Sequence, residues 1–388
     1  MPEHSISSSL DKIPKSGIRK LFDLAQNMEG IVSLGIGEPD FDTPSHIVEA
    51  SIKALKEGKT YYSPNSGILE LRQAISEKMK SQNKVDVSEN EIIVTVGGEE
   101  ALSLAIQSSI KSGDGVIVPS PAFVAYVPTV MLSGGNPIEV ECREDENFIL
   151  NPDLLEEKIT ENTELLILNS PSNPTGSVMK KSDLEKISDI VMEYNLKVLS
   201  DEVYESLIYD GKKHVSIASL NGMENNVITV NSFSKTYSMT GWRVGYLCSK
   251  DEILLDRMLK LHMYGPVCNN TFAQFGALEA LKGPQDFVDQ MREEFEDRRN
   301  LLLSRIKEMK GVSAIKPEGS FYLFMNISGM GIKSEEFSEK LLNQEKVVTV
   351  PGLAFGPYSD DYVRLAYPLK NDKINEACDR MERFLSKF

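Results

Sequence analysis

The sequence predicts an α/β fold built on a mainly parallel sheet that is covered by helices on both faces. Short apolar runs recur along the first two thirds of the chain, and segments with helical periodicity separate most of them. Strands that alternate with helices form parallel sheets, because each connecting helix packs on a face of the sheet. After about residue 285 the pattern changes to a long charged helix, short strands and further helices, which predicts a smaller α+β domain.

Composition narrows the class of protein. The chain has 388 residues, which is enough for two or possibly three domains. A net charge of −16 argues against nucleic acid or an anionic membrane as the main partner. The four cysteines form no CxxC pair and the four histidines are scattered, so we expect neither a disulfide framework nor a metal site. With no apolar signal region and no run of membrane-spanning length, we expect a cytoplasmic protein.

Hydrophobic periodicity and the residues that begin or end helices predict the secondary-structure elements along the chain. Predicted strands cover residues 31–34, 92–96, 116–118, 137–140, 165–168, 197–200, 227–230, 243–247, 321–324, 347–350 and 363–366. Predicted helices lie around residues 18–25 and at 44–58, 69–79, 97–110, 182–194, 285–310 and 334–343, with a final amphipathic helix at the C-terminus.

Polar segments follow four of the predicted strands. They begin at Gly97, Asn169, Asp201 and Ser232. Parallel strands end at the same edge of a sheet, and ligands of such sheets bind outside the carboxyl ends of the strands. The four segments are therefore expected to converge on one ligand site.

The first of these segments predicts an anion cradle. A strand, a Gly-Gly turn and an apolar helix follow one another, so backbone N–H groups and the helix dipole face an incoming anion. The segment matches neither a Walker motif nor the dinucleotide GxGxxG motif. The predicted phosphate donors are the backbone N–H groups of Gly98, Glu99 and Glu100 with the side chains of Ser232, Ser234 and Arg243.

Lys235 lies in a turn of small hydroxyl residues between two apolar runs. Burial disfavours the ammonium form, so a lysine in such a place is a candidate nucleophile and Schiff-base former. On these residues alone, an ordinary lysine in a surface turn remains an alternative.

A pyridoxal 5'-phosphate site would account for the remaining residues. It needs an amine, an anion at the pyridine nitrogen, polar groups at the ring hydroxyl, an aromatic face and an arginine for the substrate carboxylate. These needs are met in turn by Lys235, Asp201, Tyr204 with Asn173, Phe123 and Arg364. Taken singly, each of four residues has another explanation. They are Asp201 as a helix cap, Asn173 as a turn residue, Phe123 as a core residue and Arg364 as part of a structural ion pair. Their combined order favours one site.

Four motifs carry a family resemblance. They are Gly37-Glu-Pro-Asp-Phe-Asp-Thr-Pro44, Ser170-Pro-Ser-Asn-Pro-Thr-Gly176, Ser200-Asp-Glu-Val-Tyr204 and Ser232-x-Ser-Lys-x-x-x-Met-x-Gly-Trp-Arg243. From about Ile18 onward the chain resembles the class I/II aminotransferases of the fold-type-I pyridoxal-phosphate enzymes. It resembles most the archaeal aromatic and aspartate aminotransferases. The resemblance implies a large cofactor-binding domain at 44–285 and a small domain made of 1–43 and 286–388.

The resemblance also implies roles around the cofactor. Lys235 would form the Schiff base and then carry the proton during transamination. Asp201 would pair with the pyridine nitrogen. Tyr204 and Asn173 would contact the ring oxygen, and Phe123 would stack on the ring in place of the Tyr or Trp of many relatives. Glu99 and Glu100 would reach the phosphate through backbone N–H groups only.

Further implied roles concern the substrate and a second subunit. Arg364 would clamp the α-carboxylate, with Asn173 and Phe123 beside it, and the Gly37 backbone would close over the substrate. Tyr62 would reach the phosphate bound by the neighbouring subunit, which implies a homodimer with composite active sites.

The implied reaction is transamination from an L-amino acid to a 2-oxo acid such as 2-oxoglutarate, through a pyridoxal/pyridoxamine phosphate ping-pong cycle. A carbon–sulfur β-lyase on the same fold is the alternative function. A regulator that senses the cofactor is a remote alternative, and it would need a DNA-binding domain.

The amino donor is left open between aromatic and aspartate types. Four aromatic residues, Tyr61, Phe123, Tyr264 and Phe355, favour an aromatic side chain.

Overall fold

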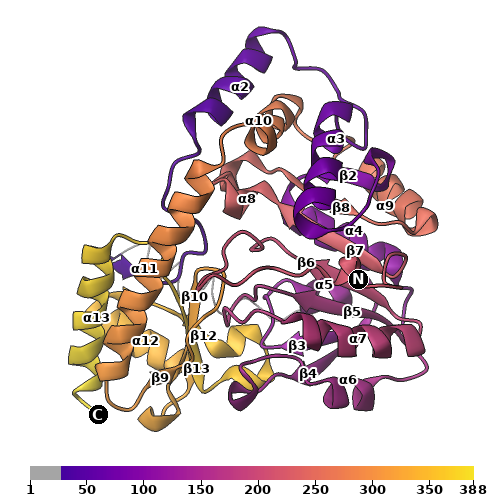
Figure 1. Cartoon of the computed structure of the whole chain (residues 1–388). Helices are drawn as coiled ribbons and strands as arrows, with labels where there is room; N and C mark the ends of the chain where they lie inside the picture. The colour runs from indigo at the N-terminus through magenta and orange to yellow at the C-terminus, as the bar shows by residue number, and fades with distance from the viewer. Residues whose placement is uncertain (1–27) are drawn as a thin grey trace, which may run out of the picture.

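A seven-stranded sheet forms the centre of the larger part of the molecule (Figure 1). The structure, a computed structural model, describes residues 28–388, so the helix predicted around residues 18–25 lies outside the described part. From edge to edge the strands are β2 (Ile92–Thr95), β8 (Gly245–Cys248), β7 (Val227–Ser232), β6 (Lys197–Asp201), β5 (Thr163–Asn169), β3 (Gly115–Ser120) and β4 (Asn136–Glu141). β8 runs antiparallel to both of its neighbours and the other pairs are parallel. The predicted mainly parallel sheet is confirmed.

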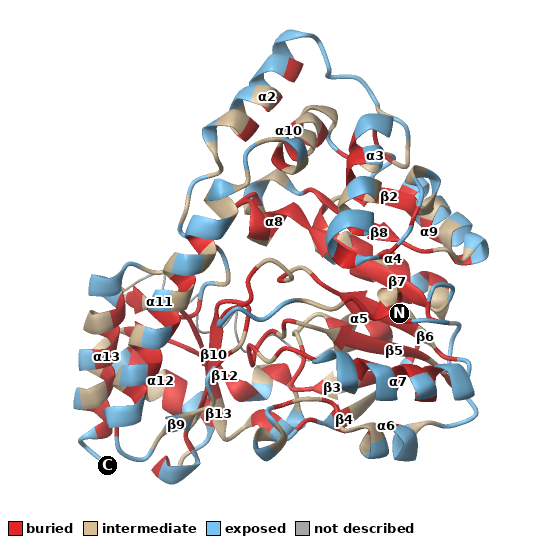
Figure 2. Cartoon of the chain, in the orientation of Figure 1, coloured by how far each residue is buried: buried red, intermediate tan, exposed pale blue. Residues whose placement is uncertain are grey.

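Both faces of this sheet are buried, as its continuous apolar strands predict. On β3, Ile117 packs into the core on one face, whereas Val116 and Val118 pack into the core on the other. The first face is covered by α3 (Leu69–Lys78), α6 (Pro152–Lys158) and α7 (Lys181–Glu193). The second face is covered by α4 (Gly97–Ser109), α5 (Tyr126–Leu132) and α9 (Glu252–Tyr264). Figure 2 shows the central strands buried between these layers.

Three further helices flank the sheet. α2 (Ser45–Lys56) packs on α10 (Thr271–Lys282), which in turn packs on α3. The short α8 (Phe233–Thr236) follows β7 directly. A π-helical turn at Met79–Asn83 extends α3 beyond its predicted end. None of the helices in residues 28–388 combines the length and apolarity that a membrane crossing needs.

The C-terminal part is α+β, as predicted. Its antiparallel sheet has the order β12 (Val350–Pro351), β13 (Tyr362–Ala366), β10 (Tyr322–Asn326) and β9 (Ser313–Ala314). The helices α11 (Asp286–Glu308), α12 (Ser334–Glu345) and α13 (Asn371–Leu385) pack beside this sheet (Figure 1). A separate parallel pair joins β1 (Val32–Ser33) to β11 (Val347–Val348).

Two predicted strands need correction. The run at 347–350 is not one strand, because β11 pairs with β1 whereas β12 pairs with β13. The strand predicted at 243–247 begins at Gly245, because Arg243 has a left-handed backbone with φ of 55°. That conformation ends the preceding turn and brings the Arg243 side chain to the edge of the sheet.

The division into domains stays a prediction. Val32 and Leu34 share a hydrophobic core with residues of α11, α12 and α13, which supports assigning residues 28–43 to the C-terminal part. Tyr204 and Leu207 enter the same core from the segment after β6. The boundaries at 44 and 285 are therefore our proposal.

An ion pair between a buried arginine and an exposed aspartate ties α11 to the segment between β6 and β7. The Arg299 side chain is fully buried and donates to both carboxylate oxygens of Asp210, at 2.8 and 3.1 Å. It also donates to the Pro317 carbonyl at 2.9 Å. Hydrogen bonds from Arg299 and Lys316 hold the pKa of Asp210 well below its usual range.

We predict that Asp210→Asn destabilises the fold by about 1 kcal/mol, because Arg299 loses the charge of one of its two carboxylate partners and keeps Glu296 at 3.2 Å. A depressed pKa in the folded state stabilises at pH values above the unfolded pKa and loses this contribution as pH falls. The difference from wild type should hold between about pH 5 and pH 8 and shrink below about pH 4. Urea unfolding across this range measures it. Asp189→Asn, at an exposed position of α7, is the control, and equal effects of the two variants would contradict the prediction.

Candidate active site

A cavity of about 460 Å³ opens at the carboxyl edge of the large sheet. The ends of β2, β5, β6 and β7 meet there, which confirms the predicted convergence of four polar segments. The predicted site residues that line the cavity are Gly37, Gly98, Glu99, Phe123, Asn173, Asp201, Tyr204, Ser232, Ser234, Lys235, Arg243 and Arg364. The C-terminal part supplies Tyr322 and Arg364, so both parts of the chain build the cavity.

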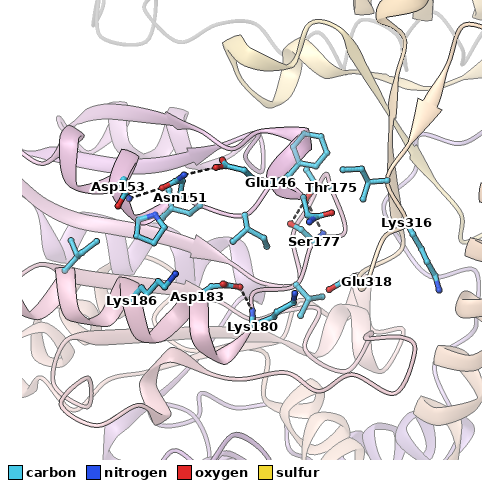
Figure 3. A pocket seen from close by; sticks show the side chains of 18 of the residues that line it. Glu146, Asn151, Asp153, Thr175, Ser177, Lys180, Asp183, Lys186, Lys316 and Glu318 are labelled. Carbon is cyan, nitrogen blue, oxygen red and sulfur yellow. Dashed lines mark hydrogen bonds between the residues drawn. The ribbon is translucent and has the colours of Figure 1, made fainter.

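A second, larger hollow of about 640 Å³ lies between α7, the loop before α6 and residues 315–318 (Figure 3). Its polar groups pair with one another: Thr175 with Ser177 at 2.7 Å between hydroxyls, and Asn151 with Glu146 at 2.7 Å. It contains none of the predicted catalytic residues. The cavity at the carboxyl edge of the large sheet is therefore the candidate active site.

The anion cradle has the predicted form. Gly97 opens α4 with φ of +79°, and a Cβ there would lie 2.5 Å from Nη2 of Arg243, so a larger residue would strain the backbone and displace this guanidinium. Arg243 donates from Nη1 to the Thr240 carbonyl at 3.0 Å, and its other N–H groups have no acceptor among the described residues. The hydroxyls of Ser232 and Ser234 lie 2.9 Å apart beside the turn. A helix N-terminus with a free guanidinium and two hydroxyls is suited to a phosphate group.

Asp201 ends β6 and is 4% exposed. Its carboxylate accepts hydrogen bonds from the Tyr126 hydroxyl at 2.6 Å and from the Val203 N–H at 3.3 Å. Burial raises its pKa to about 6, and the Tyr126 hydrogen bond opposes that rise. No cation forms a salt bridge with it in residues 28–388. A buried carboxylate that lacks a cation is placed to pair with a protonated ring nitrogen.

Lys235 lies in α8, a short helix that Ser232 caps by accepting from the Ser234 N–H. The Lys235 Nζ donates to the Gly37 carbonyl at 2.6 Å. Burial lowers the pKa of Lys235 to about 8. The neutral, nucleophilic fraction of this amine near neutral pH is therefore larger than that of an ordinary lysine.

Arg364 is 6% exposed and has no acidic partner in the described part of the chain. It donates to the Asn173 Oδ1 at 3.0 Å and to the Gly35 carbonyl at 2.8 Å, while its Nε has no partner. The guanidinium lies 4.3 Å from the ring centroid of Tyr322. A buried guanidinium held only by neutral groups is placed to receive a carboxylate.

The sequence analysis missed two tyrosines at the site: Tyr126, which bonds Asp201, and Tyr322, which lines the cavity. Tyr126 binds Asp201, and Tyr322 shares a hydrogen bond of 3.0 Å with the Tyr204 hydroxyl. Asn169 accepts from the Asn173 N–H at 2.8 Å and so fixes the loop that carries it. Tyr126 follows Phe123 by three residues after a strand end, which is a signal that could have found it. Tyr322 gave no comparable signal.

Two predicted cofactor residues do not line the cavity. The Glu100 side chain accepts from the Val96 N–H at 2.5 Å and pairs with Nδ1 of His262 at 2.9 Å, so it braces the start of α4. Only its backbone remains for the predicted phosphate contact. Tyr62 is 85% exposed and lies outside the cavity of its own chain.

The predicted aromatic set is mostly absent from the cavity. Phe355 is buried beneath Arg364, with its ring centroid 5.1 Å from the guanidinium carbon. Tyr61 and Tyr264 are each 83% exposed. Of the four aromatic residues, Phe123 alone lines the cavity within one chain.

A partly buried lysine, a buried carboxylate and a buried guanidinium thus meet at the carboxyl edge of a mainly parallel sheet. Residues 29–381 match the family model for aminotransferase class I and II, and the chain belongs to this family. Members of the family are in general dependent on pyridoxal phosphate.

Close relatives agree with this assignment. The chain is 48% identical over 386 residues to aromatic-amino-acid aminotransferase 2 of Thermococcus litoralis, which covers 99% of each chain. It is 49% identical over 384 residues to an aspartate aminotransferase of Pyrococcus abyssi, which covers 98% of each. A crystal structure of an aromatic aminotransferase from Pyrococcus horikoshii matches with a TM-score of 0.90 at 46% identity, over 95% of this chain and 99% of that one. The predicted family and fold are confirmed.

We predict that Tyr126→Phe raises the pKa of Asp201 from about 6 by about one unit or more. The variant keeps the ring packing but removes the hydroxyl that stabilises the carboxylate. Infrared titration of the protein without added cofactor measures the carboxyl, with Asp201→Asn to assign the band. Tyr209→Phe, at a buried tyrosine of the C-terminal core that donates to the Ser320 carbonyl, is the control. An unchanged Asp201 pKa in Tyr126→Phe would show that the hydrogen bond has no electrostatic effect.

Proposed function

We propose that this aminotransferase uses pyridoxal 5'-phosphate to move the amino group of an L-amino acid to a 2-oxo acid such as 2-oxoglutarate. One observation carries the proposal. A single cavity holds a lysine with a pKa lowered to about 8, a buried carboxylate without a cation and a buried guanidinium without a carboxylate. Each of these is costly in a folded protein unless a ligand supplies the missing partner.

The cavity residues fit the cofactor group by group. When bound, pyridoxal phosphate supplies an aldehyde that exchanges amino groups and a ring that accepts electrons released at the substrate Cα. The cradle of Gly98, Ser232, Ser234 and Arg243 would hold the phosphate. Asp201 would hold a proton on the pyridine nitrogen, and the Tyr204 hydroxyl would face the ring oxygen.

Lys235 and its surroundings would perform the proton transfers. Its Nζ would hold the aldehyde carbon of the cofactor and, when free, would carry the proton that leaves the substrate Cα. The Gly37 carbonyl, now 2.6 Å from this amine, would then release it. The Gly37 backbone belongs to the segment that borders the substrate side of the cavity.

Arg364 would bind the α-carboxylate of the substrate, with Asn173 orienting the guanidinium.

The cations that line the cavity in the described chain are Lys235, Arg243 and Arg364, and each has a role in the proposal already. No further cation is present for the distal carboxylate of aspartate within one chain, whereas Phe123 offers an apolar wall. We therefore propose that aromatic donors are at least as good as aspartate.

A donor panel tests this function. With 2-oxoglutarate as acceptor, we expect glutamate formation from phenylalanine, tyrosine and aspartate, ranked by kcat/KM. Lys235→Ala should lose turnover by a factor of about 10² or more, because the proton carrier is absent. Lys181→Ala, on the exposed start of α7, is the control. Near-wild-type transamination by Lys235→Ala would overturn the mechanism, and a hundredfold preference for aspartate would overturn the aromatic assignment.

The same assay separates the β-lyase alternative. An eliminating enzyme would release ammonia and a 2-oxo acid from a cysteine conjugate without needing an acceptor. The relatives described above are named aminotransferases, which favours transamination. Acceptor-independent ammonia release as the faster reaction would reverse that choice.

We further propose a cytoplasmic homodimer in which Tyr62 completes the phosphate site of the other subunit. Tyr61, Tyr62 and Tyr264 are each more than 80% exposed, and such large aromatic surface is typical of a site for a partner. A second copy of the chain would cover it.

We predict that mixed dimers of Lys235→Ala and Tyr62→Ala regain activity. Each parent dimer carries a lesion in both sites. A mixed dimer would concentrate both lesions in one site and leave the other intact. Activity after co-refolding should therefore rise with the mixed fraction measured by mass spectrometry. Tyr194→Ala, at a tyrosine that bonds Glu156, replaces Tyr62→Ala in the control mixture. An average of the two parents, with subunit exchange demonstrated, would place Tyr62 in its own chain's site or in none.

A further inference from the structure

Two residues of the cavity alternate along the chain with two buried acidic residues that do not line it. Asp201 and Tyr204 line the cavity, whereas Glu202 and Glu205 do not. The side chains of Glu202 and Glu205 are only 1% and 9% exposed. The mechanism above gives these two buried carboxylates no role.

The partners of Glu202 are mostly close in sequence. Its carboxylate pairs with Nε2 of His214 at 2.8 Å. It also accepts from the hydroxyls of Ser200 at 2.9 Å and Ser216 at 2.7 Å. These residues belong to β6 and to the segment that follows it, so Glu202 holds its own segment together.

Glu205 instead joins three separate elements. Lys78, at the end of α3, donates from Nζ to its Oε1. Asn83, in the π-helical turn after α3, donates to its Oε2 at 2.6 Å, and Asn231 of β7 donates to its Oε1 at 2.6 Å. A buried ion pair adds little net stability, because the cost of removing both charges from water offsets their attraction. The main consequence of these bonds is therefore a fixed geometry at Asn231.

The Glu205 carboxylate determines which end of the Asn231 amide faces it. A carboxylate that is paired with an ammonium group only accepts hydrogen bonds, so the amide must turn its NH2 group toward Glu205. The amide oxygen Oδ1 is then left to accept the Ser232 N–H, at 2.7 Å. Asn231 is 3% exposed and does not line the cavity, so it acts on the site only through Ser232.

Ser232 is where this series of bonds reaches the anion cradle. Its hydroxyl lies at the cavity, donates to the Ser234 hydroxyl at 2.9 Å and accepts from the Ser234 N–H at 3.2 Å. Ser232 also caps α8, the helix that carries Lys235. A rotation of the Ser232 backbone would therefore move the hydroxyl that faces an incoming phosphate.

We propose that Glu205, acting through Asn231, is a positioning residue for the phosphate of the cofactor. It holds the Asn231 amide in one orientation, and this amide holds the Ser232 backbone so that the hydroxyl faces the phosphate. The inference rests on the proposed function, because it explains how the same cofactor site is kept in shape.

Two variants remove different bonds of this series. Asn231→Ala removes both bonds of the amide. The double variant Lys78→Gln with Glu205→Gln removes two opposite charges together, so no buried charge loses its partner. The new amide at position 205 can present either its oxygen or its NH2 group, so it no longer fixes the direction of Asn231.

A matched control lies just before the same strand. Asn226→Ala removes an asparagine that donates to the Leu196 carbonyl at 3.0 Å, at the end of β7 away from the cavity. Urea unfolding measures the loss of stability in each variant, and circular dichroism verifies that each is folded.

The readout is the binding of pyridoxamine phosphate to the protein without cofactor. This ligand has an amine in place of the aldehyde, so the chemistry of Lys235 does not enter. Calorimetry gives its affinity, and the phosphorus NMR resonance of the bound ligand reports the surroundings of the phosphate. Pyridoxamine, which lacks the phosphate, serves as the second ligand.

We expect Asn231→Ala to bind pyridoxamine phosphate about fivefold to tenfold more weakly than wild type, and to shift the resonance of the bound phosphate. The double variant should show the same two changes to a smaller extent. Asn226→Ala should lose stability and keep the wild-type affinity and resonance. Pyridoxamine should bind equally well to all four proteins.

Two results would count against the proposal in different ways. If Asn231→Ala and the double variant lose stability but keep the wild-type affinity and resonance, the bonds serve the fold alone, and the proposed function stays intact. If folded wild-type protein binds neither pyridoxamine phosphate nor pyridoxal phosphate, the proposed function fails and the inference fails with it.

Discussion

The site depends on the cost of a buried charge that has no partner. Asp201 and Arg364 are almost fully buried, yet the described chain supplies no cation to the first and no anion to the second. Neutral groups hold both in position: the Tyr126 hydroxyl for the carboxylate, the Asn173 amide and a carbonyl for the guanidinium. The rest of the fold provides the stability that keeps these two charges apart and unpaired until a ligand arrives.

Arg299, a second buried arginine of the molecule, has carboxylate partners within the described chain, unlike Arg364. Arg299 is fully buried like Arg364, but both of its terminal nitrogens bond Asp210, and Nη2 also bonds Glu296. These bonds join α11 to the segment between β6 and β7. The contrast shows how the same residue type serves packing when it is matched and ligand binding when it is left open.

The two parts of the chain meet at the reacting groups. The large sheet brings Asp201 and Lys235 to its carboxyl edge, whereas β10 and β13 bring Tyr322 and Arg364. The hydroxyls of Tyr204 and Tyr322 and the Arg364–Asn173 bond cross this junction.

The sequence by itself determined the parallel sheet, the converging strand ends and most of the cavity, because strand periodicity and short motifs are local properties. It could not determine side-chain direction. Glu100 turns away to His262, and Phe355 lies beneath Arg364, because contacts with distant segments decide where each side chain packs. The bonds Tyr126–Asp201 and Arg364–Asn173 join positions 75 and 191 residues apart. Only the tertiary structure decided these pairings, since no local pattern encodes which distant groups will share a dry cavity.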